Sequence, residues 1–226
     1  MNFLYLLGPL YLSAWDNNEI RYSLRSLDKA YPVDWLGITG PEVPAFLSGI
    51  THIKVRHEPM LGKCWNTQRQ TLDACLLPGT PEHLVLMNDD FIVRAPWSGY
   101  TTHRGPLQAH RSVHRWTQSL TDTRTWLQAR GIADPLCFEG HTPMPFEKSK
   151  AIPILYELLS TGKDLQFRSA YGNLTGVKGV RSPNAKRRDP AKWPEDFPFW
   201  SLSGTPTGKA MRFLEKSFPA PSRWEV

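Results

Sequence analysis

The chain has 226 residues, of which 40% are hydrophobic, so it can bury a core of its own, and this argues against global disorder. Its 27 Lys and Arg residues outnumber its 21 Asp and Glu residues and give a formal charge of +6. Such a basic balance suits nucleic acid, phosphorylated ligands or anionic surfaces, and selects none of them. Three cysteines without a CxxC spacing argue against a disulfide framework or a zinc site, and a reducing compartment such as the cytoplasm is the simplest context.

The first stretch, MNFLYLLGPLYLSAWD, is apolar enough to raise the question of a signal peptide. It lacks a basic start and a small-x-small cleavage site. A buried strand over Asn2–Leu7, ended by Gly8-Pro9, is therefore the favoured interpretation. No later run approaches the roughly 20 apolar residues that a membrane span needs, so we expect no such span.

Strand-like and helix-like segments alternate in the first half of the chain. In chain order, the pattern predicts a strand at 2–7, a helix at 17–30, strands at 35–39 and 52–56, a helix at 64–77 and a strand at 84–88. Alternation of this kind is typical of an α/β fold with helices packed around a mostly parallel sheet. The second half is less regular, with helices expected at 113–130, 147–161 and 211–218 and a stretch rich in Gly, Pro, Ser and basic residues at 171–207.

Two adjacent carboxylates interrupt the apolar run LVLMNDDFIV. Asn88, Asp89 and Asp90 fall at the end of the expected strand 84–88. In parallel α/β sheets, ligands bind beyond the carboxyl ends of the strands. Neighbouring carboxylates repel each other and lose hydration there, unless a cation compensates them. Oxygen ligands suit Mg²⁺ or Mn²⁺, which in turn suit phosphate oxygens; the alternative is that both acids cap a loop or a helix start.

An aspartate pair after an apolar strand resembles the DxD-type motif of GT-A glycosyltransferases, which holds a divalent metal on the diphosphate of a nucleotide sugar. More of the chain resembles the Stealth-type sugar-phosphate transferases and their short glycosyltransferase-like relatives. Five segments carry this second resemblance, in the family's order and over nearly the whole chain: DNNEIRYSLRSLDKA (Asp16–Ala30), KCWNTQRQTLDACL (Lys63–Leu76), LVLMNDDFIV (Leu84–Val93), GHTPMPFEKSKA (Gly140–Ala151) and FPAPSRWE (Phe218–Glu225).

The resemblance implies a GT-A-like, Rossmann-like α/β fold with a central mostly parallel sheet and an irregular C-terminal acceptor lobe. It implies one domain over 1–226, with a nucleotide-sugar-binding half at about 1–110 and an acceptor or lid half at about 111–226. The implied activity is metal-dependent transfer of a sugar from a nucleotide sugar, expected to be a UDP-sugar, with Mn²⁺ or Mg²⁺ held by Asp89 and Asp90.

The sequence departs from the Stealth-type group in two ways, of which the first is its short length. The family's late acidic residue falls here in FWSLSGTP, where Ser201 and Ser203 stand and no Asp is present. Transfer of a plain sugar to an acceptor hydroxyl is therefore favoured at least as well as transfer of a sugar-1-phosphate.

Four polar residues on the first two helices are candidates for binding the donor. Arg21 and Arg25 lie one helical turn apart and share a face, so they can form a fork for phosphate; the alternative is an ordinary exposed basic face. Asn66 and Arg69 lie three apart on the helix 64–77, and in the resemblance this segment faces the sugar donor. The alternative for Asn66 is a polar residue at a helix N-terminus.

Three residues of the second half are candidates for the chemistry. His141, in the proline-rich loop GHTPMPF, is a candidate metal ligand or general base, the alternative being a solvated loop histidine. Glu139 is a second candidate base. A positive group should meet the leaving diphosphate, and Arg168 is the candidate for it.

The run VKGVRSPNAKRRDPAKWP contains the basic segment Lys178–Lys192. It can act as a lid over donor phosphates, as an arm along a nucleic-acid backbone, or as a solvated loop. A polysaccharide acceptor fits the family, and a modified base in DNA fits the charge. Two other functions stay open: a sugar-1-phosphate transferase, and a non-enzymatic nucleic-acid-binding protein in which Asp89 and Asp90 are structural.

Overall fold

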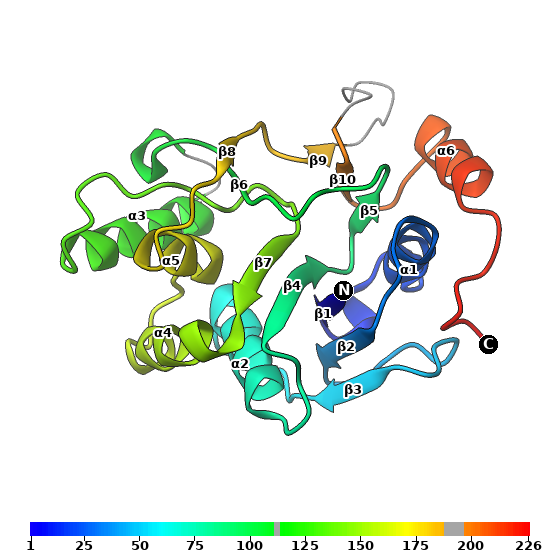
Figure 1. Ribbon diagram of the computed structural model, residues 1–226, viewed down its shortest axis with the longest axis horizontal. Helices are drawn as coiled ribbons and strands as arrows, with labels where there is room; N and C mark the ends of the chain where they lie inside the picture. The colour runs from blue at the N-terminus through cyan, green and yellow to red at the C-terminus, as the bar shows by residue number, and fades with distance from the viewer. Residues whose placement is uncertain (111–113, 188–196) are drawn as a thin grey trace.

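A five-stranded sheet forms the centre of the computed structural model, which describes residues 1–110, 114–187 and 197–226 (Figure 1). The strand order is β3-β2-β1-β4-β7, in which the first four strands are parallel and β7 runs antiparallel to β4. The bounds are β1 (Asn2–Leu6), β2 (Trp35–Gly40), β3 (Thr51–Lys54), β4 (His83–Asn88) and β7 (Met144–Glu147). The expected mostly parallel sheet is confirmed, and β7 adds an antiparallel edge that the sequence pattern did not predict.

Alternating side chains of β1 belong to two cores, one on each face of the sheet. Phe3 and Tyr5 pack with α1 (Asn18–Ala30), and Leu4 and Leu6 belong to the core on the opposite face. That opposite face is covered by α2 (Lys63–Leu76), α4 (Lys148–Ser160) and α5 (Phe167–Leu174), with α3 (His114–Gln128) against α5 (Figure 1). Burial of both faces explains why the strands read as nearly continuous apolar runs.

Two smaller sheets lie beyond the carboxyl ends of the central strands. One has the order β5-β10-β9, made of β5 (Phe91–Val93), β10 (Phe199–Leu202) and β9 (Lys186–Arg187). The other pairs β6 (Thr102–His103) with β8 (Val180–Arg181). The last helix, α6 (Lys209–Ser217), packs against β10, and short 3₁₀ turns lie at Leu10–Leu12 and Leu107–Ala109. None of the described helices combines the length and apolarity needed to cross a bilayer.

The expected helices and first-half strands are present, with ends shifted by one or two residues. The elements without a sequence signal are β7, α5 and the short strands β5, β6, β8, β9 and β10. Pro145 lies inside β7 and Gly172 inside α5, and both residue types argue against the element that contains them. The LVLMNDDFIV run is two strands: β4 ends at Asn88, and β5 belongs to a different sheet.

Candidate functional site

The carboxyl ends of β1 and β4 meet where the strand order of the sheet reverses. From β1 the chain crosses to β2 on one side and later returns to β4 on the other. Such a switch point is where open α/β sheets bind ligands. A cavity of about 230 Å³ opens there, lined by Leu7, Gly8, Pro9, Leu12, Ser13, Asn17, Glu19, Lys63, Asn88, Asp89, Asp90, His141, Lys186, Leu202 and Gly204.

One carboxylate oxygen of Asp90 is hydrogen-bonded, and the other has no partner among the described residues. Its Oδ2 accepts a hydrogen bond of 2.7 Å from Ser201 Oγ and lies 3.4 Å from Lys186 Nζ. Its Oδ1 is buried and has no hydrogen-bond partner among the described residues. A buried acceptor without a partner is costly, so this oxygen is a position where a bound cation or donor group is expected.

Asp89 lies next to Asp90 in the turn between β4 and β5. Burial, followed by repulsion from Asp90, raises the pKa of Asp89 to about 7, although the charge of Lys63 opposes the rise. The pair thus carries unfavourable charge in the protein without a cation, as the adjacent carboxylates predicted.

His141 lines the same cavity, and its backbone has a strained conformation with positive φ. Asp16, Asn17 and His141 are the non-glycine residues with positive φ in the described part of the chain, and the last two line the cavity. Strain of this kind gathers at functional sites. His141 Nδ1 pairs with Asn184 Oδ1 at 2.8 Å, and burial lowers the pKa of His141 to about 4. The ring is therefore neutral at pH 7, and Nδ1 donates to Asn184, which leaves the Nε2 lone pair available.

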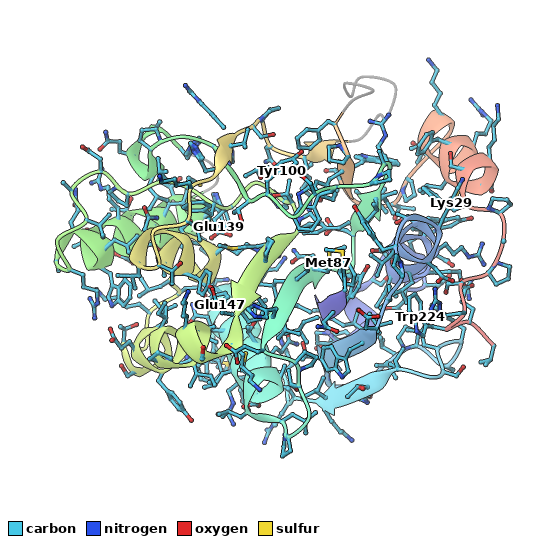
Figure 2. The ribbon with its side chains drawn as sticks, viewed as in Figure 1. Lys29, Met87, Tyr100, Glu139, Glu147 and Trp224 are labelled. Atoms are coloured by element: carbon cyan, nitrogen blue, oxygen red, sulfur yellow. The ribbon has the colours of Figure 1, made fainter. Side chains whose placement is uncertain are left out.

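Arg168 and Glu139 lie behind the cavity and do not line it. Arg168 is buried; its Nη1 donates to the carbonyl of Thr142 at 2.7 Å and its Nη2 to Asn88 Oδ1 at 2.9 Å. Glu139 accepts hydrogen bonds from the backbone N and the Oγ of Ser169, in α5, at 3.0 and 3.1 Å. Figure 2 shows Glu139 beside α5 and Met87 at the end of β4. Burial raises the pKa of Glu139, and the nearby Arg168 opposes that rise.

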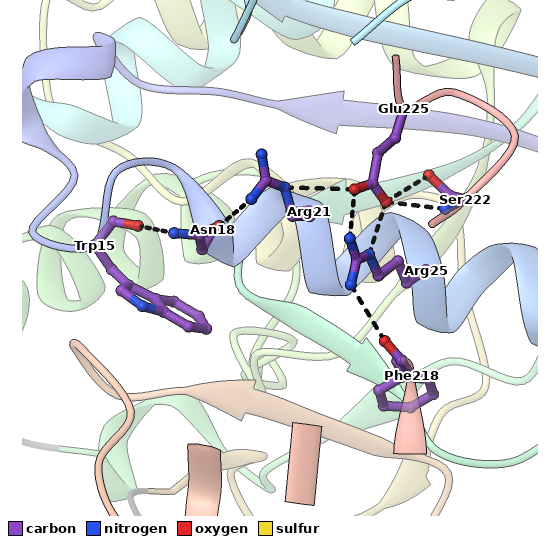
Figure 3. Close-up of polar contacts among 7 residues, drawn as sticks. All are labelled: Trp15, Asn18, Arg21, Arg25, Phe218, Ser222 and Glu225. Carbon is purple, nitrogen blue, oxygen red and sulfur yellow. Dashed lines mark hydrogen bonds and ion pairs between the residues drawn. The ribbon is translucent and has the colours of Figure 1, made fainter. Parts of the chain in front are cut away.

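The candidates for donor binding on α1 and α2 have partners outside this cavity. Arg25 binds Glu225 through two nitrogens at 2.8 and 2.7 Å, and Arg21 lies 3.4 Å from the same carboxylate (Figure 3). Asn66 bonds to the backbone of Glu58 in both directions and to the carbonyl of Gly62, and Arg69 pairs with Asp73. None of the four lines the cavity, and their role in binding the donor stays a prediction.

The basic run is described only in part. Lys186 lines the cavity, whereas Arg188, Asp189 and Lys192 lie outside the described residues, so the lid hypothesis for Lys178–Lys192 stays a prediction. Sequence reasoning assigned no individual role to Lys63, Lys186 or Glu19. Each stands far in sequence from Asp89 and Asp90, so only the folded topology reveals that they share the cavity.

The described residues alone supply too few ligands to surround a metal ion. Within the described ranges, no three His, Cys, Asp or Glu side chains gather closely enough to share one ion, so Asp89, Asp90 and His141 do not form the cluster that the sequence suggested. Two carboxylates with one open oxygen still fit Mg²⁺ or Mn²⁺, because such ions are often held by one or two carboxylates together with substrate phosphates.

The fold is shared with known glycosyltransferases. The chain is similar to galactosyltransferase LgtC in complex with donor and acceptor sugar analogues, at a TM-score of 0.56 and 12% identity over 99% of this chain and 98% of that one. An active-site variant of LgtC gives a TM-score of 0.57 with the same identity and coverage. Mouse xyloside xylosyltransferase 1 matches at a TM-score of 0.44 and 10% identity over 85% of this chain and 89% of its own, which supports no further conclusion.

These similarities confirm the expected fold class, a mixed α/β fold of the GT-A kind, and identities this low show the fold alone. No family model matches the chain, and no curated protein matches its sequence. The resemblance to Stealth-type transferases therefore stays a prediction.

Proposed function

We propose that the chain is a glycosyltransferase that moves a sugar from a nucleotide sugar, such as a UDP-sugar, to an acceptor hydroxyl. The observation that carries this proposal is the carboxylate pair Asp89–Asp90 in the cavity at the β1/β4 switch point. The same fold serves a galactosyltransferase, which supports the choice of reaction class.

Asp89 and Asp90 would hold Mn²⁺ or Mg²⁺, with the open Oδ1 of Asp90 as one ligand. Bound there, the ion would supply positive charge to the departing diphosphate. Ser201 fixes the orientation of Asp90 by donating to its other oxygen. Lys63 and Lys186 add two cationic side chains to the cavity, and both suit the phosphate oxygens of the donor.

His141 is the better placed of the two candidate bases. It lines the cavity with a neutral ring whose Nε2 can accept the proton of the acceptor hydroxyl as that oxygen attacks the sugar. Glu139 and Arg168 act as positioning residues in this scheme. Arg168 ties Asn88, just before the acid pair, to Thr142, just after His141, and so holds the two sides of the site together.

The identity of the released nucleotide distinguishes sugar transfer from sugar-1-phosphate transfer. Wild-type protein is incubated with Mn²⁺ and UDP-, GDP-, dTDP-, ADP- and CMP-sugars, and the released nucleotide is identified by mass spectrometry. Sugar transfer from a diphosphate donor cleaves the sugar–phosphate bond and releases a nucleoside diphosphate. Transfer of a sugar-1-phosphate cleaves the diphosphate and releases a nucleoside monophosphate. Release of the monophosphate from a UDP-, GDP-, dTDP- or ADP-sugar would favour the Stealth-type alternative, whereas a CMP-sugar releases CMP on plain sugar transfer. No release from any donor would contradict both.

A further inference from the structure

A second cavity, of about 320 Å³, lies on the α2 side of the molecule and takes no part in the site described above. Three parts of the chain form its wall: the start of α2 with the loop before it, one face of α3, and the turn between α4 and α5. The lining residues are Met60, Leu61, Gly62, Trp65, Arg115, Gln118, Ser119, Asp122, Gly162, Lys163 and Asp164.

The floor of this cavity is fixed by hydrogen bonds among its walls. Asp164 Oδ1 accepts from the backbone N of Trp65 at 3.0 Å, which ties the α4–α5 turn to α2. Ser119 of α3 donates to the carbonyl of Asp164 and accepts from Gln166 Nε2 at 2.6 Å. A Cβ on Gly62 would lie only 2.2 Å from Asp164 Oδ1, so this close approach requires glycine. The cavity is therefore preorganised.

The upper walls combine an unstacked indole with hydrogen-bonding groups. Trp65 is half-buried, and no aromatic or cationic partner for its ring occurs among the described residues. Met60 is 91% exposed and Leu61 40%, so an apolar rim stays open to solvent. Across from them, Gln118 Nε2 donates to Asp122 Oδ1 at 3.0 Å on α3, which leaves the second oxygen of Asp122 for a ligand.

This combination suits a sugar ring. One face of a pyranose is made of C–H groups, which pack on an indole, and its rim carries hydroxyls, which bond to carboxylate and amide groups. Nucleobases also stack on indoles. The wall carries two acids, Asp122 and Asp164, and two basic residues, Arg115 and Lys163, so it has no net formal charge. A wall without net charge favours a neutral, hydroxyl-rich ligand over a polyanionic strand.

The two cavities adjoin at the start of α2. Gly62 lines the second cavity, and Lys63, the next residue, lines the cavity with Asp89 and Asp90. The backbone at Gly62-Lys63 therefore forms part of the wall of both cavities. In a transferase the acceptor must bind next to the donor, and a cavity that shares the start of α2 with the Asp89–Asp90 cavity is a candidate for that role.

We infer that the cavity between α2, α3 and the α4–α5 turn is the acceptor subsite and binds a saccharide, with Trp65 as its stacking platform and Asp122 as a hydroxyl-binding carboxylate. This inference rests on the proposed function and names the acceptor class for it.

The test uses a panel of 4-nitrophenyl glycosides as acceptors and the donor that wild-type protein consumes. Trp65→Ala removes the platform, and Asp122→Asn keeps the shape of the side chain but removes its charge. Tyr156→Ala, an exposed aromatic on α4, and Asp134→Asn, an exposed loop acid, are matched controls outside the cavity. The ratio of transfer to the glycoside over transfer to water is measured for each folded variant, together with glycoside binding by saturation-transfer NMR.

We expect Trp65→Ala to lower the transfer-to-hydrolysis ratio about tenfold and to weaken glycoside binding by NMR to the same extent, because an aromatic contact contributes up to about that factor. Asp122→Asn should lower the ratio in the same direction, and both controls should match wild type. Hydrolysis of the donor without transfer to any glycoside, or transfer only to DNA that contains hydroxymethylated bases, would overturn the inference and leave the glycosyltransferase proposal intact. No consumption of any donor would contradict the proposed function, and glycoside binding equal in wild type and Trp65→Ala would then overturn the inference separately.

Discussion

Ser201 Oγ donates a hydrogen bond of 2.7 Å to Asp90 Oδ2 across 111 positions of sequence. The contact exists because β10 pairs with β5, whose first residue directly follows Asp90; Ser201 lies opposite Phe91 in that ladder. Ser201 thus supplies a neutral hydrogen-bond donor to Asp90 from the opposite side of the ladder.

Replacing Ser201 by alanine should weaken the site without unfolding the protein. Ser201→Ala removes a hydrogen bond to a charged group, worth about 1.5–3 kcal/mol, so we expect the catalytic efficiency with the donor to fall about tenfold or more. Ser203→Ala, two residues later and outside the first cavity, is the matched control. The catalytic efficiency of both variants is measured by steady-state kinetics. Equal catalytic efficiencies for Ser201→Ala and wild type would show that this hydrogen bond does not support Asp90.

The raised pKa of Asp89 predicts a stability that depends on pH and on metal. A carboxyl whose pKa rises from 3.8 to about 7 on folding stabilises the fold when protonated, and that contribution is lost as the pH rises from about 4 through 7. In metal-free buffer at pH 8, Asp89→Asn should therefore melt about 3 °C or more above wild type. Mn²⁺ should raise the melting temperature of wild type but not of the variant.

Differential scanning calorimetry at pH 5 and pH 8 checks this dependence. Asp134→Asn, which replaces an exposed acid outside the first cavity, controls for the change in net charge. An Asp89→Asn variant that is less stable than wild type at pH 8 without metal would contradict the argument.

The ion pairs of Arg21 and Arg25 with Glu225 predict that Glu225 stabilises the fold. Glu225 pairs with both arginines and accepts from the backbone of Ser222, and its side chain is only 7% exposed (Figure 3). Burial alone would raise the pKa of Glu225, but hydrogen bonds from Arg25 and Ser222 outweigh it and lower the pKa. Glu225→Gln should lower the free energy of unfolding by about 1.5–3 kcal/mol at pH 7, the contribution of a hydrogen bond to a charged group.

The destabilisation caused by Glu225→Gln should be smaller at acidic pH. A carboxyl with a lowered pKa in the folded state stabilises above its unfolded pKa, near 4.5, and loses that contribution as the pH falls through the folded value. Urea titrations at pH 7 and pH 3.5 measure the change, with Glu215→Gln on the exposed face of α6 as the matched control. A donor-binding role for Arg25 would show instead as weaker nucleotide binding by Arg25→Lys in a protein of normal stability.

Lys186 should contribute to nucleotide affinity. Its ammonium group lies 3.4 Å from Asp90 in the cavity and is close to where the donor diphosphate would bind. Lys186→Gln should weaken binding of the nucleoside diphosphate about tenfold, because a charge-assisted hydrogen bond is lost. Isothermal titration calorimetry with Lys178→Gln as control measures this, and unchanged affinity would remove Lys186 from the donor site.

The sequence predicted the elements whose periodicity is strong and whose neighbours are close in the chain. Alternation around β1 to β4 and the position of Asp89 and Asp90 at a strand end followed from local pattern. The partners of Asp90 did not, because Lys186 and Ser201 reach it through β9 and β10, which are two and four residues long and carry no periodic signal. Glu225 was missed as the partner of Arg21 and Arg25 for the same reason, since a contact across 200 positions leaves no local trace.

The most direct test of the central claim is a thermal-shift measurement with Mn²⁺ and a panel of nucleoside diphosphates, on wild type and Asp90→Ala. A ligand at 100 times its Kd adds about 2.7 kcal/mol to the free energy of unfolding, a clear shift in the melting temperature. We expect one nucleotide to stabilise wild type only when Mn²⁺ is present, and this stabilisation to be absent in the folded variant. No shift with any nucleotide in folded wild-type protein would contradict the account and favour a nucleic-acid-binding protein in which Asp89 and Asp90 are structural.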